Sequence, residues 1–154
     1  MNTKRLGNIG EAVVLSEFVK RQIPIYIQFG DTEKADYIAE FNGKLNKIQV
    51  KTCEKCSKDK KWFSIKPYST TTKNGKPIIQ KYTKSEVDYF AIYCLELNIL
   101  VFYPNENVPE QLIFRIVSPA NNQKKGVKMV NDYTLDKILS NLPLPTNLTN
   151  AGEV

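Results

Sequence analysis

The sequence feature that most constrains the fold is an Asn-Gly dipeptide between two segments of alternating apolar and polar residues. Asn42-Gly43 separates a segment at 36–41 from one that begins at residue 44 or 46 and ends at 53. Asn-Gly is the dipeptide most typical of a two-residue β-hairpin turn. A slip of one residue would turn every side chain to the other face, so the buried face fixes the pairing register. We therefore expect an antiparallel strand pair here.

The segments around this hairpin predict an α/β fold. Apolar residues at helical spacing predict a helix over 7–21, which Pro24 ends. We interpret residues 67–82, rich in Thr, Asn, Gly and Pro, as a loop. Further strands are predicted at 23–29, 62–66, 87–95, 99–103 and 112–117, and a short helix capped by Thr134 at 134–139. This order predicts a mixed β-sheet with the N-terminal helix packed on it.

Length and composition indicate one domain. With 154 residues, 42% of them apolar, the chain can form a core. We expect a single domain over 1–142 and a loose C-terminal tail over 143–154, where no periodicity is visible. No signal peptide and no apolar run of about 18 residues is found. We therefore expect a cytoplasmic protein with no membrane contact.

The chain contains no His. This excludes Ser-His-Asp and Cys-His nucleophile systems and HExxH zinc sites, and leaves carboxylates, Lys, Tyr, Cys or a hard metal ion for any catalysis. Cys53 and Cys56 form a CxxC, but no second CxxC or His would complete a zinc site. We interpret the two as reduced thiols in a cytosolic loop.

Positive charge is concentrated in one part of the chain. The net charge is +6, yet residues 44–84 hold twelve Lys against two acidic residues, a surplus of +10. Such a surface, interleaved with aromatic residues, fits a nucleic acid, although it could also be a solvated face. We predict that nine lysines contact DNA: Lys55, Lys58, Lys60, Lys61, Lys73, Lys76, Lys81, Lys124 and Lys125.

Four polar residues are expected to converge at one end of the predicted hairpin. Alternation places Gln49 and Lys51 on the strand face away from the core. The turn places Asp36 roughly opposite them, and Glu11 reaches the same place if the helix packs over the sheet. Asp36 and Gln49 supply oxygen ligands for a hard cation, with the Val50 carbonyl as a third. Lys51 would orient a water or neutralise charge on a phosphoryl oxygen.

Each of these residues also has an ordinary structural interpretation. Glu11 could be an exposed helix residue and Asp36 a turn cap. Gln49 and Lys51 could form the solvated face of a strand, which is the usual meaning of alternation. We favour the functional interpretation because the four residues converge on one place.

These motifs resemble the PD-(D/E)xK nuclease superfamily, whose core is a helix carrying a Glu followed by a β-hairpin bearing Asp and then (D/E)xK. The matching strings are GNIGE at 7–11, ADY at 35–37 and IQVKT at 48–52, with Ala where Pro usually precedes the Asp. QxK in place of (D/E)xK is similar to the branch of group I intron-encoded homing endonucleases, which shares features with archaeal Holliday junction resolvases. Residues 86–93 and 102–104 also look like this branch, so the resemblance spans about residues 4–139.

The resemblance implies a restriction-endonuclease-like fold and a Mg²⁺-dependent DNA endonuclease, with Mn²⁺ as a substitute metal. Glu11, Asp36, Gln49 and Lys51 would be catalytic, and the first three would bind the metal. Cutting both strands of double-stranded DNA calls for a homodimer or homotetramer. Double-strand cutting of the homing-endonuclease type is the first expectation. A Holliday-junction-type structure-selective nuclease and a non-catalytic DNA-binding protein on the same scaffold are the alternatives.

Overall fold

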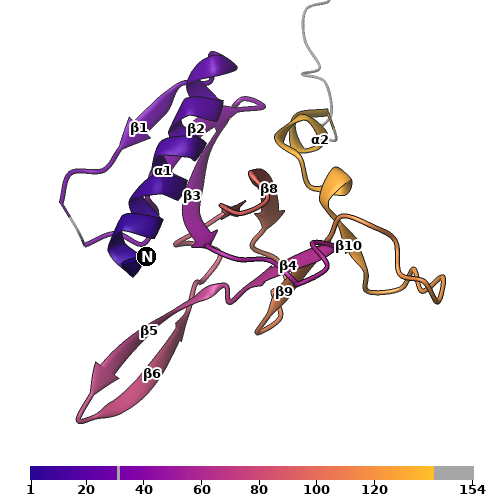
Figure 1. The fold of residues 1–154 in the computed structure, drawn as a ribbon. Helices are drawn as coiled ribbons and strands as arrows, with labels where there is room; N and C mark the ends of the chain where they lie inside the picture. The colour runs from indigo at the N-terminus through magenta and orange to yellow at the C-terminus, as the bar shows by residue number, and fades with distance from the viewer. Residues whose placement is uncertain (31, 141–154) are drawn as a thin grey trace, which may run out of the picture.

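The computed structural model describes residues 1–30 and 32–140. Its centre is a five-stranded sheet with the order β1-β2-β3-β7-β8, in which only β3 and β7 run parallel (Figure 1). The strands are β1 Ile25–Ile27, β2 Tyr37–Phe41, β3 Lys44–Cys53, β7 Tyr89–Cys94 and β8 Ile99–Pro104. The helix α1, Thr3–Lys20, packs against this sheet. The mixed sheet with an N-terminal helix is therefore confirmed.

Two smaller sheets complete the described fold. The first has the order β10-β9-β4, and the second is the two-stranded ribbon β5-β6, which projects from the body in Figure 1. Their strands are β4 Trp62–Ile65, β9 Leu112–Arg115, β10 Lys128–Met129, β5 Tyr68–Lys73 and β6 Lys76–Lys81. A 3₁₀ turn at Val130–Asp132 and the helix α2, Leu135–Ser140, follow. No helix in the described part of the chain combines the length and apolar character needed to cross a membrane.

The core has two parts because alternate residues of β3 and β7 face opposite sides of the sheet. On one side, Val14 and Phe18 of α1 pack over Ile48 and Val50. On the other side, Phe90 and Ile92 pack with Phe63 and Phe114 of the three-stranded sheet. The three-stranded sheet β10-β9-β4 thus packs on β7 and β8, and the pairing of β3 with β7 places Gln49 and Lys51 on the same face as Phe90 and Ile92.

The hairpin at Asn42-Gly43 forms as predicted. Both residues have positive φ, 57° and 67°, the backbone of a type I′ turn. The turn sets the register Tyr37↔Ile48, so Asp36 lies beside Gln49 at the end of the pair. The residue types of the turn set the register, and the register places Asp36 beside Gln49 at the end of the strand pair.

Two predicted helix ends can be compared with the structure. The first helix begins at Thr3 rather than residue 7, because the Asn2 side chain accepts a hydrogen bond from the Lys4 amide at 2.8 Å and caps it. The Thr134 cap is confirmed, since its Oγ1 accepts a hydrogen bond from the Lys137 amide at 3.3 Å. The predicted tail at 143–154 lies outside the described residues, and the single domain over 1–142 stays a prediction.

The loop predicted at 67–82 is wrong. This segment is the β5-β6 hairpin, with six residue pairs from Tyr68↔Lys81 to Lys73↔Lys76. Asn74 and Gly75 have φ values of 52° and 74°, which repeats the turn backbone of the first hairpin. The strands of this ribbon carry Thr and Lys in place of the alternating apolar residues of a core strand, so their composition resembles that of a loop.

Candidate active site

Asp36 and Gln49 form the centre of the candidate site at the end of the β2-β3 hairpin. The Asp36 carboxylate oxygen Oδ2 accepts hydrogen bonds from the Val50 amide and from Gln49 Nε2, each at 2.6 Å. The same Gln49 nitrogen donates to the Val50 carbonyl at 3.1 Å. The Gln49 nitrogen thus lies between the charged Asp36 carboxylate and the neutral Val50 carbonyl. A cation in the place of this nitrogen would contact both oxygens.

Glu11 approaches this centre from α1. Gly10 brings the helix close to β3: a Cβ on Gly10 would lie 1.9 Å from Thr52 Oγ1, so only glycine permits this approach. Tyr37 Oη donates to the Glu11 carbonyl at 3.1 Å and holds the same helix turn against β2. The half-buried Glu11 side chain therefore lies within the electrostatic reach of Asp36.

Burial raises the pKa of both carboxyl groups. Desolvation is the main cause of the raised pKa of Glu11, and the negative charge of Asp36 adds to it. Desolvation also raises the pKa of Asp36, although the Val50 amide, the Lys51 charge and the Gln49 amide act in the opposite direction. Two neighbouring carboxylates that are costly to ionise form a site that a divalent cation would stabilise.

Lys51 lies two residues further along β3, on the same face as Gln49. Its ammonium Nζ donates to Tyr82 Oη at 2.8 Å and to the Tyr68 carbonyl at 3.3 Å. It also lies 4.8 Å from the centre of the Tyr82 ring. Tyr82 itself packs edge-on against Phe90 of the second core. Lys51 is therefore held at a defined position by the root of the β5-β6 ribbon.

The donor set at this site fits a hard divalent cation. Asp36 and Glu11 supply carboxylates, the Val50 carbonyl is directed at the centre, and rotation of the Gln49 amide would present its oxygen in place of its nitrogen. Among the described residues no cluster of three His, Cys, Asp or Glu could hold a metal ion. The candidate site has only two carboxylates, one residue fewer than such a cluster of three. With the neutral oxygens of Gln49 and Val50 it still offers four oxygen ligands.

The nine lysines predicted to contact DNA are all exposed, but they do not form one cluster. Lys55, Lys58, Lys60 and Lys61 lie in the connection between β3 and β4. Another three, at 73, 76 and 81, lie on the β5-β6 ribbon. The pair at 124–125 lies between β9 and β10, in a segment that projects away from the ribbon in Figure 1. The structure thus separates the basic residues into three groups.

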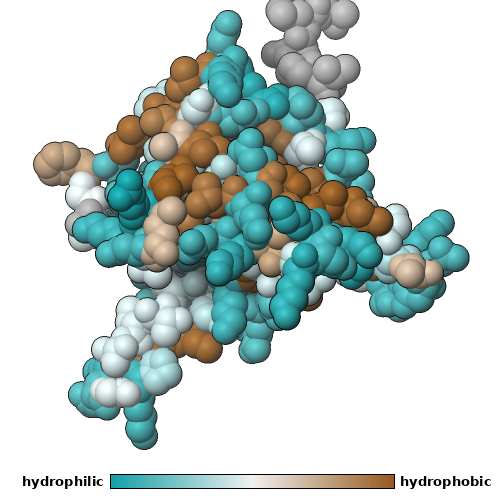
Figure 2. Space-filling model, viewed as in Figure 1, coloured by the Kyte–Doolittle hydropathy of each residue, from teal (hydrophilic) through white to brown (hydrophobic). Residues whose placement is uncertain are grey.

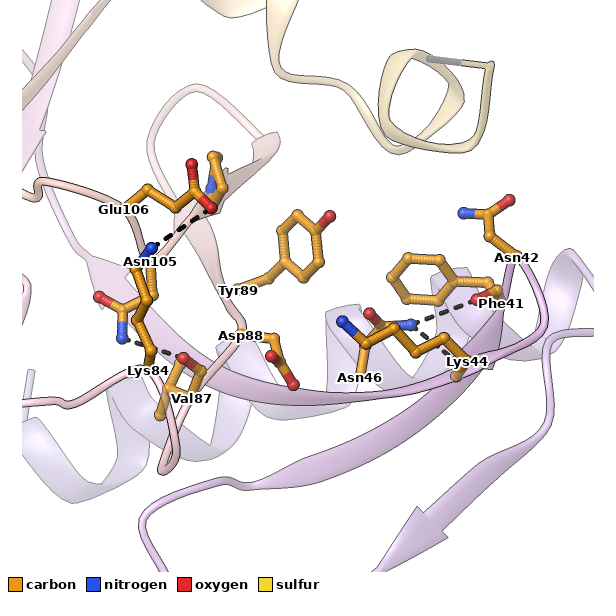
Figure 3. A pocket seen from close by; sticks show the side chains of 11 residues that line it. Phe41, Asn42, Lys44, Asn46, Lys84, Val87, Asp88, Tyr89, Asn105 and Glu106 are labelled. Atoms are coloured by element: carbon orange, nitrogen blue, oxygen red, sulfur yellow. Dashed lines mark hydrogen bonds and ion pairs between the residues drawn. The ribbon is translucent and has the colours of Figure 1, made fainter. Parts of the chain in front are cut away.

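The pocket drawn in Figure 3 is a separate feature. It lies on the α1 side of the sheet, where Phe41 packs against Tyr89 with ring centres 5.9 Å apart. The buried Asn46 satisfies its amide nitrogen there on three backbone carbonyls, those of Ala39, Phe41 and Lys44. None of the predicted site residues lines this pocket, which we interpret as a structural hollow near the turn of the β2-β3 hairpin.

Comparison with protein families identifies the class to which this fold and site belong. A model of PD-(D/E)XK endonucleases matches residues 1–136, which is most of the chain. The chain therefore belongs to the PD-(D/E)XK endonuclease family, as the motifs predicted. Among solved structures it is similar to the bacterial homing endonuclease I-Ssp6803I, with a TM-score of 0.69 and 20% sequence identity over 86% of this chain and 88% of that chain. A comparison with curated proteins gave no match.

Sequence reasoning missed Tyr82 as a neighbour of the site. It approaches Lys51 across 31 residues, and only the ribbon between them brings the two together. The available signal was a second Asn-Gly pair at 74–75, because a hairpin there returns the chain to its starting point beside β3.

Proposed function

We propose that this member of the family is a divalent-metal-dependent DNA endonuclease whose site consists of Glu11, Asp36, Gln49 and Lys51. The observation that carries the proposal is the arrangement around Asp36. Its carboxylate, the Gln49 amide and the Val50 carbonyl meet within hydrogen-bond distance, and Glu11 and Lys51 lie beside them. Mg²⁺ is the metal that we propose, with Mn²⁺ as a substitute.

Asp36, Glu11 and Gln49 would hold the metal, together with the Val50 carbonyl. When bound, the metal would supply Lewis-acid polarisation of the scissile phosphate. Its charge would also offset the cost of ionising the two buried carboxyl groups. The oxygen-only donor set and the absence of His and of a second CxxC favour a hard cation over zinc.

Lys51 would act on the reacting atoms. Its ammonium has three N–H donors, and the acceptors found for it among the described residues are Tyr82 Oη and the Tyr68 carbonyl, which are neutral. The remaining donor would orient the attacking water or contact a phosphoryl oxygen. In the reaction a water oxygen bonds to phosphorus and the bond to the 3′-oxygen breaks. The attacking water loses one proton and the 3′-oxygen gains one, which leaves 5′-phosphate and 3′-hydroxyl ends.

We propose double-stranded DNA as the substrate and double-strand cutting of the homing type as the outcome. Two strands of opposite direction require two sites related by symmetry, so we propose a homodimer or homotetramer acting in the cytoplasm. The similarity of the fold to that of I-Ssp6803I, a bacterial homing endonuclease, supports this choice. A Holliday-junction-type nuclease with the same site would recognise DNA shape instead of sequence.

A non-catalytic DNA-binding protein is the second candidate, and Gln49 is the observation that favours it. An amide in place of the usual acid removes one negative charge from the metal site. Such a protein would bind DNA in a salt-dependent manner that does not respond to Mg²⁺.

The test is cleavage of two substrates, a plasmid library with randomised inserts and a set of four-way junctions, with Mg²⁺, Mn²⁺ or EDTA. Metal-dependent cutting of particular inserts supports the homing-type proposal, whereas cutting of junctions without sequence preference supports the alternative nuclease. Binding of both substrates without cleavage under any metal condition would overturn the endonuclease proposal and favour the binding protein.

A further inference from the structure

The β5-β6 ribbon, residues 68–81, is exposed almost throughout. Every residue from Thr70 to Lys81 is exposed, and only the root residues Tyr68 and Ser69 are half-buried. In Figure 1 the ribbon extends away from the central sheet as a separate arm. A two-stranded ribbon in water is marginally stable, so a length of chain that buries so little is expected to have a binding partner.

The composition of the arm indicates the chemistry of that partner. No acidic residue occurs from Lys60 to Ser85, a stretch that contains seven Lys. On the arm itself the other side chains are mainly hydroxyls and amides, and Figure 2 shows it as largely pale and teal with a small brown area. Two apolar side chains, Ile78 and Ile79, are exposed there. Hydroxyl, amide and Lys side chains without acidic neighbours match phosphates and base edges.

The pairing register places equivalent side chains on both faces of the arm. Thr71 pairs with Ile78 on one face, and Thr70 pairs with Ile79 on the other. Lys73 and Lys76 form the last pair beside the turn. Each face therefore carries a hydrogen-bonding group beside an apolar group, and the positive charges are at the tip.

The dimensions of the arm fit the major groove of duplex DNA. Six residue pairs span about 20 Å at ~3.3 Å per residue, and the two strands lie about 5 Å apart. The major groove is about 12 Å wide and about 8.5 Å deep, and it admits a two-stranded β-ribbon. The minor groove of undistorted DNA is about 6 Å wide, so it would have to be widened to admit the arm, at a cost in DNA deformation energy.

We infer that the β5-β6 arm enters the major groove of duplex DNA and contacts base edges there. This inference rests on the proposed function, because it assigns the part of the chain that selects the DNA sequence. Thr71 would hydrogen-bond to base edges or phosphates, and Ile78 would contact thymine methyl groups. Lys73 and Lys76 at the tip would bind phosphates without sequence preference.

The root of the arm gives this placement a consequence for cleavage. Tyr68 and Tyr82 border the arm, and both hold the Lys51 ammonium. The position of the arm in the groove is therefore connected to the position of Lys51 through two hydrogen bonds. This connection would set the distance between the bases that the arm contacts and the phosphate that is cut.

The test compares the sequences that the full-length wild type and its arm variants select from a randomised duplex library in Ca²⁺. Thr71→Ala/Ile78→Ala changes one face of the arm and Lys73→Gln/Lys76→Gln changes the tip. Lys20→Gln, which removes one positive charge at the exposed end of α1, is the control outside the arm. The first variant should lose about 10- to 100-fold of its preference at one cluster of bases. The second should bind all duplexes more weakly and reduce the salt slope by about 2.

Methylation of guanine N7, a major-groove atom, supplies a second readout. Wild-type protein should protect the bases whose selection the arm variants lose, and Lys20→Gln should behave as the wild type. If the arm variants select the same sequence with the same stringency while the wild type binds and cuts DNA, the arm inference is overturned and the endonuclease proposal stands. If the wild type binds no duplex at low salt, both are overturned.

Discussion

The Lys51 ammonium lies 2.8 Å from the Tyr82 hydroxyl oxygen and 4.8 Å from the centre of the same ring. Tyr82 therefore holds Lys51 through a hydrogen bond at the hydroxyl end of its ring. This hydrogen bond does not neutralise the ammonium, so the charge remains available to a phosphate. A carboxylate partner in this position would compete with the DNA for the same charge.

Removing only the Tyr82 hydroxyl should therefore slow cleavage without unfolding the protein. In Tyr82→Phe the ring still packs against Phe90, but the hydrogen-bond acceptor for Lys51 is lost. A hydrogen bond to a charged group contributes about 1.5–3 kcal/mol, so we expect a decrease of about 10- to 100-fold in the single-turnover rate. DNA affinity should change little.

The matched control is Tyr103→Phe. Tyr103 lies in the second core, where its hydroxyl makes no hydrogen bond to a described residue. This substitution should leave the cleavage rate unchanged. Equal cleavage rates for Tyr82→Phe and the wild type would show that Tyr82 does not position Lys51.

The contact between Gly10 and Thr52 predicts opposite effects for two glycine substitutions in α1. A Cβ at Gly10 would overlap Thr52 Oγ1, whereas a Cβ at Gly7 has nothing within 4 Å. We expect Gly10→Ala to lower the free energy of unfolding by about 1–3 kcal/mol through overpacking. Gly7→Ala should raise it by up to about 1 kcal/mol, because Ala favours the helix. Urea unfolding measures both.

The same pair of variants also tests the placement of Glu11. Displacement of α1 would move Glu11 away from Asp36, so Gly10→Ala should need more Mg²⁺ for half-maximal cleavage than Gly7→Ala. A Gly10→Ala protein with wild-type stability and wild-type Mg²⁺ dependence would contradict the close approach of helix and strand.

Replacing Gln49 by Glu should make the stability of the folded protein depend more strongly on bound Mg²⁺. Gln49 Nε2 donates to Asp36 Oδ2 at 2.6 Å and to the Val50 carbonyl at 3.1 Å. In Gln49→Glu these donors are replaced by an acceptor facing two oxygens. We expect the metal-free protein to lose about 1–3 kcal/mol of stability and Mg²⁺ to restore most of it. Thermal unfolding in EDTA and in Mg²⁺ measures this. The rise of the unfolding midpoint caused by Mg²⁺ should be larger for Gln49→Glu than for the wild type.

The raised pKa of Asp36 predicts the pH dependence of the metal-free protein. Burial, its main cause, makes the folded state hold this proton to a higher pH than the unfolded state does. The stability contributed by Asp36 is therefore present at low pH and is lost as pH rises through the raised pKa. Asp36→Asn removes this loss while keeping an acceptor for the Val50 amide. Its unfolding midpoint should exceed that of the wild type at neutral pH in EDTA.

Asp59 provides a control because its pKa is shifted in the opposite direction to that of Asp36. A hydrogen bond from Ser57 lowers the pKa of this exposed carboxyl, so its contribution is present at neutral pH and is lost as pH falls. Asp59→Asn should not raise the unfolding midpoint at neutral pH. If Asp36→Asn is also no more stable than the wild type there, burial does not make ionised Asp36 costly to the folded state.

The sequence alone was sufficient for the hairpin that carries the site. Asn42-Gly43 determines a two-residue turn, and the apolar residues Ile48 and Val50 must face the core, so the positions of Asp36, Gln49 and Lys51 followed from local rules. Glu11 required the further assumption that the helix packs over the sheet. Gly10 permits that packing, but the sequence does not show which strand it meets.

Two features could not be predicted for physical reasons. The β5-β6 arm has no buried face, so its strands lack the periodicity by which strands are detected. The Tyr82 contact depends on where the arm returns, which is a tertiary relationship. The sheet of β4, β9 and β10 pairs segments about 50 residues apart, Trp62 with Arg115 for example, and no local pattern indicates such a pairing.

The most direct test of the endonuclease site is single-turnover cleavage of a selected duplex by Lys51→Ala and Asp36→Asn in Mg²⁺, with DNA binding measured in Ca²⁺ on the same proteins. We expect both variants to bind the duplex with near wild-type affinity and to cut it at least about 10³-fold more slowly, with Lys20→Gln unchanged. Wild-type cleavage rates in both variants, with the fold intact by thermal unfolding, would show that the reaction takes place elsewhere on the protein.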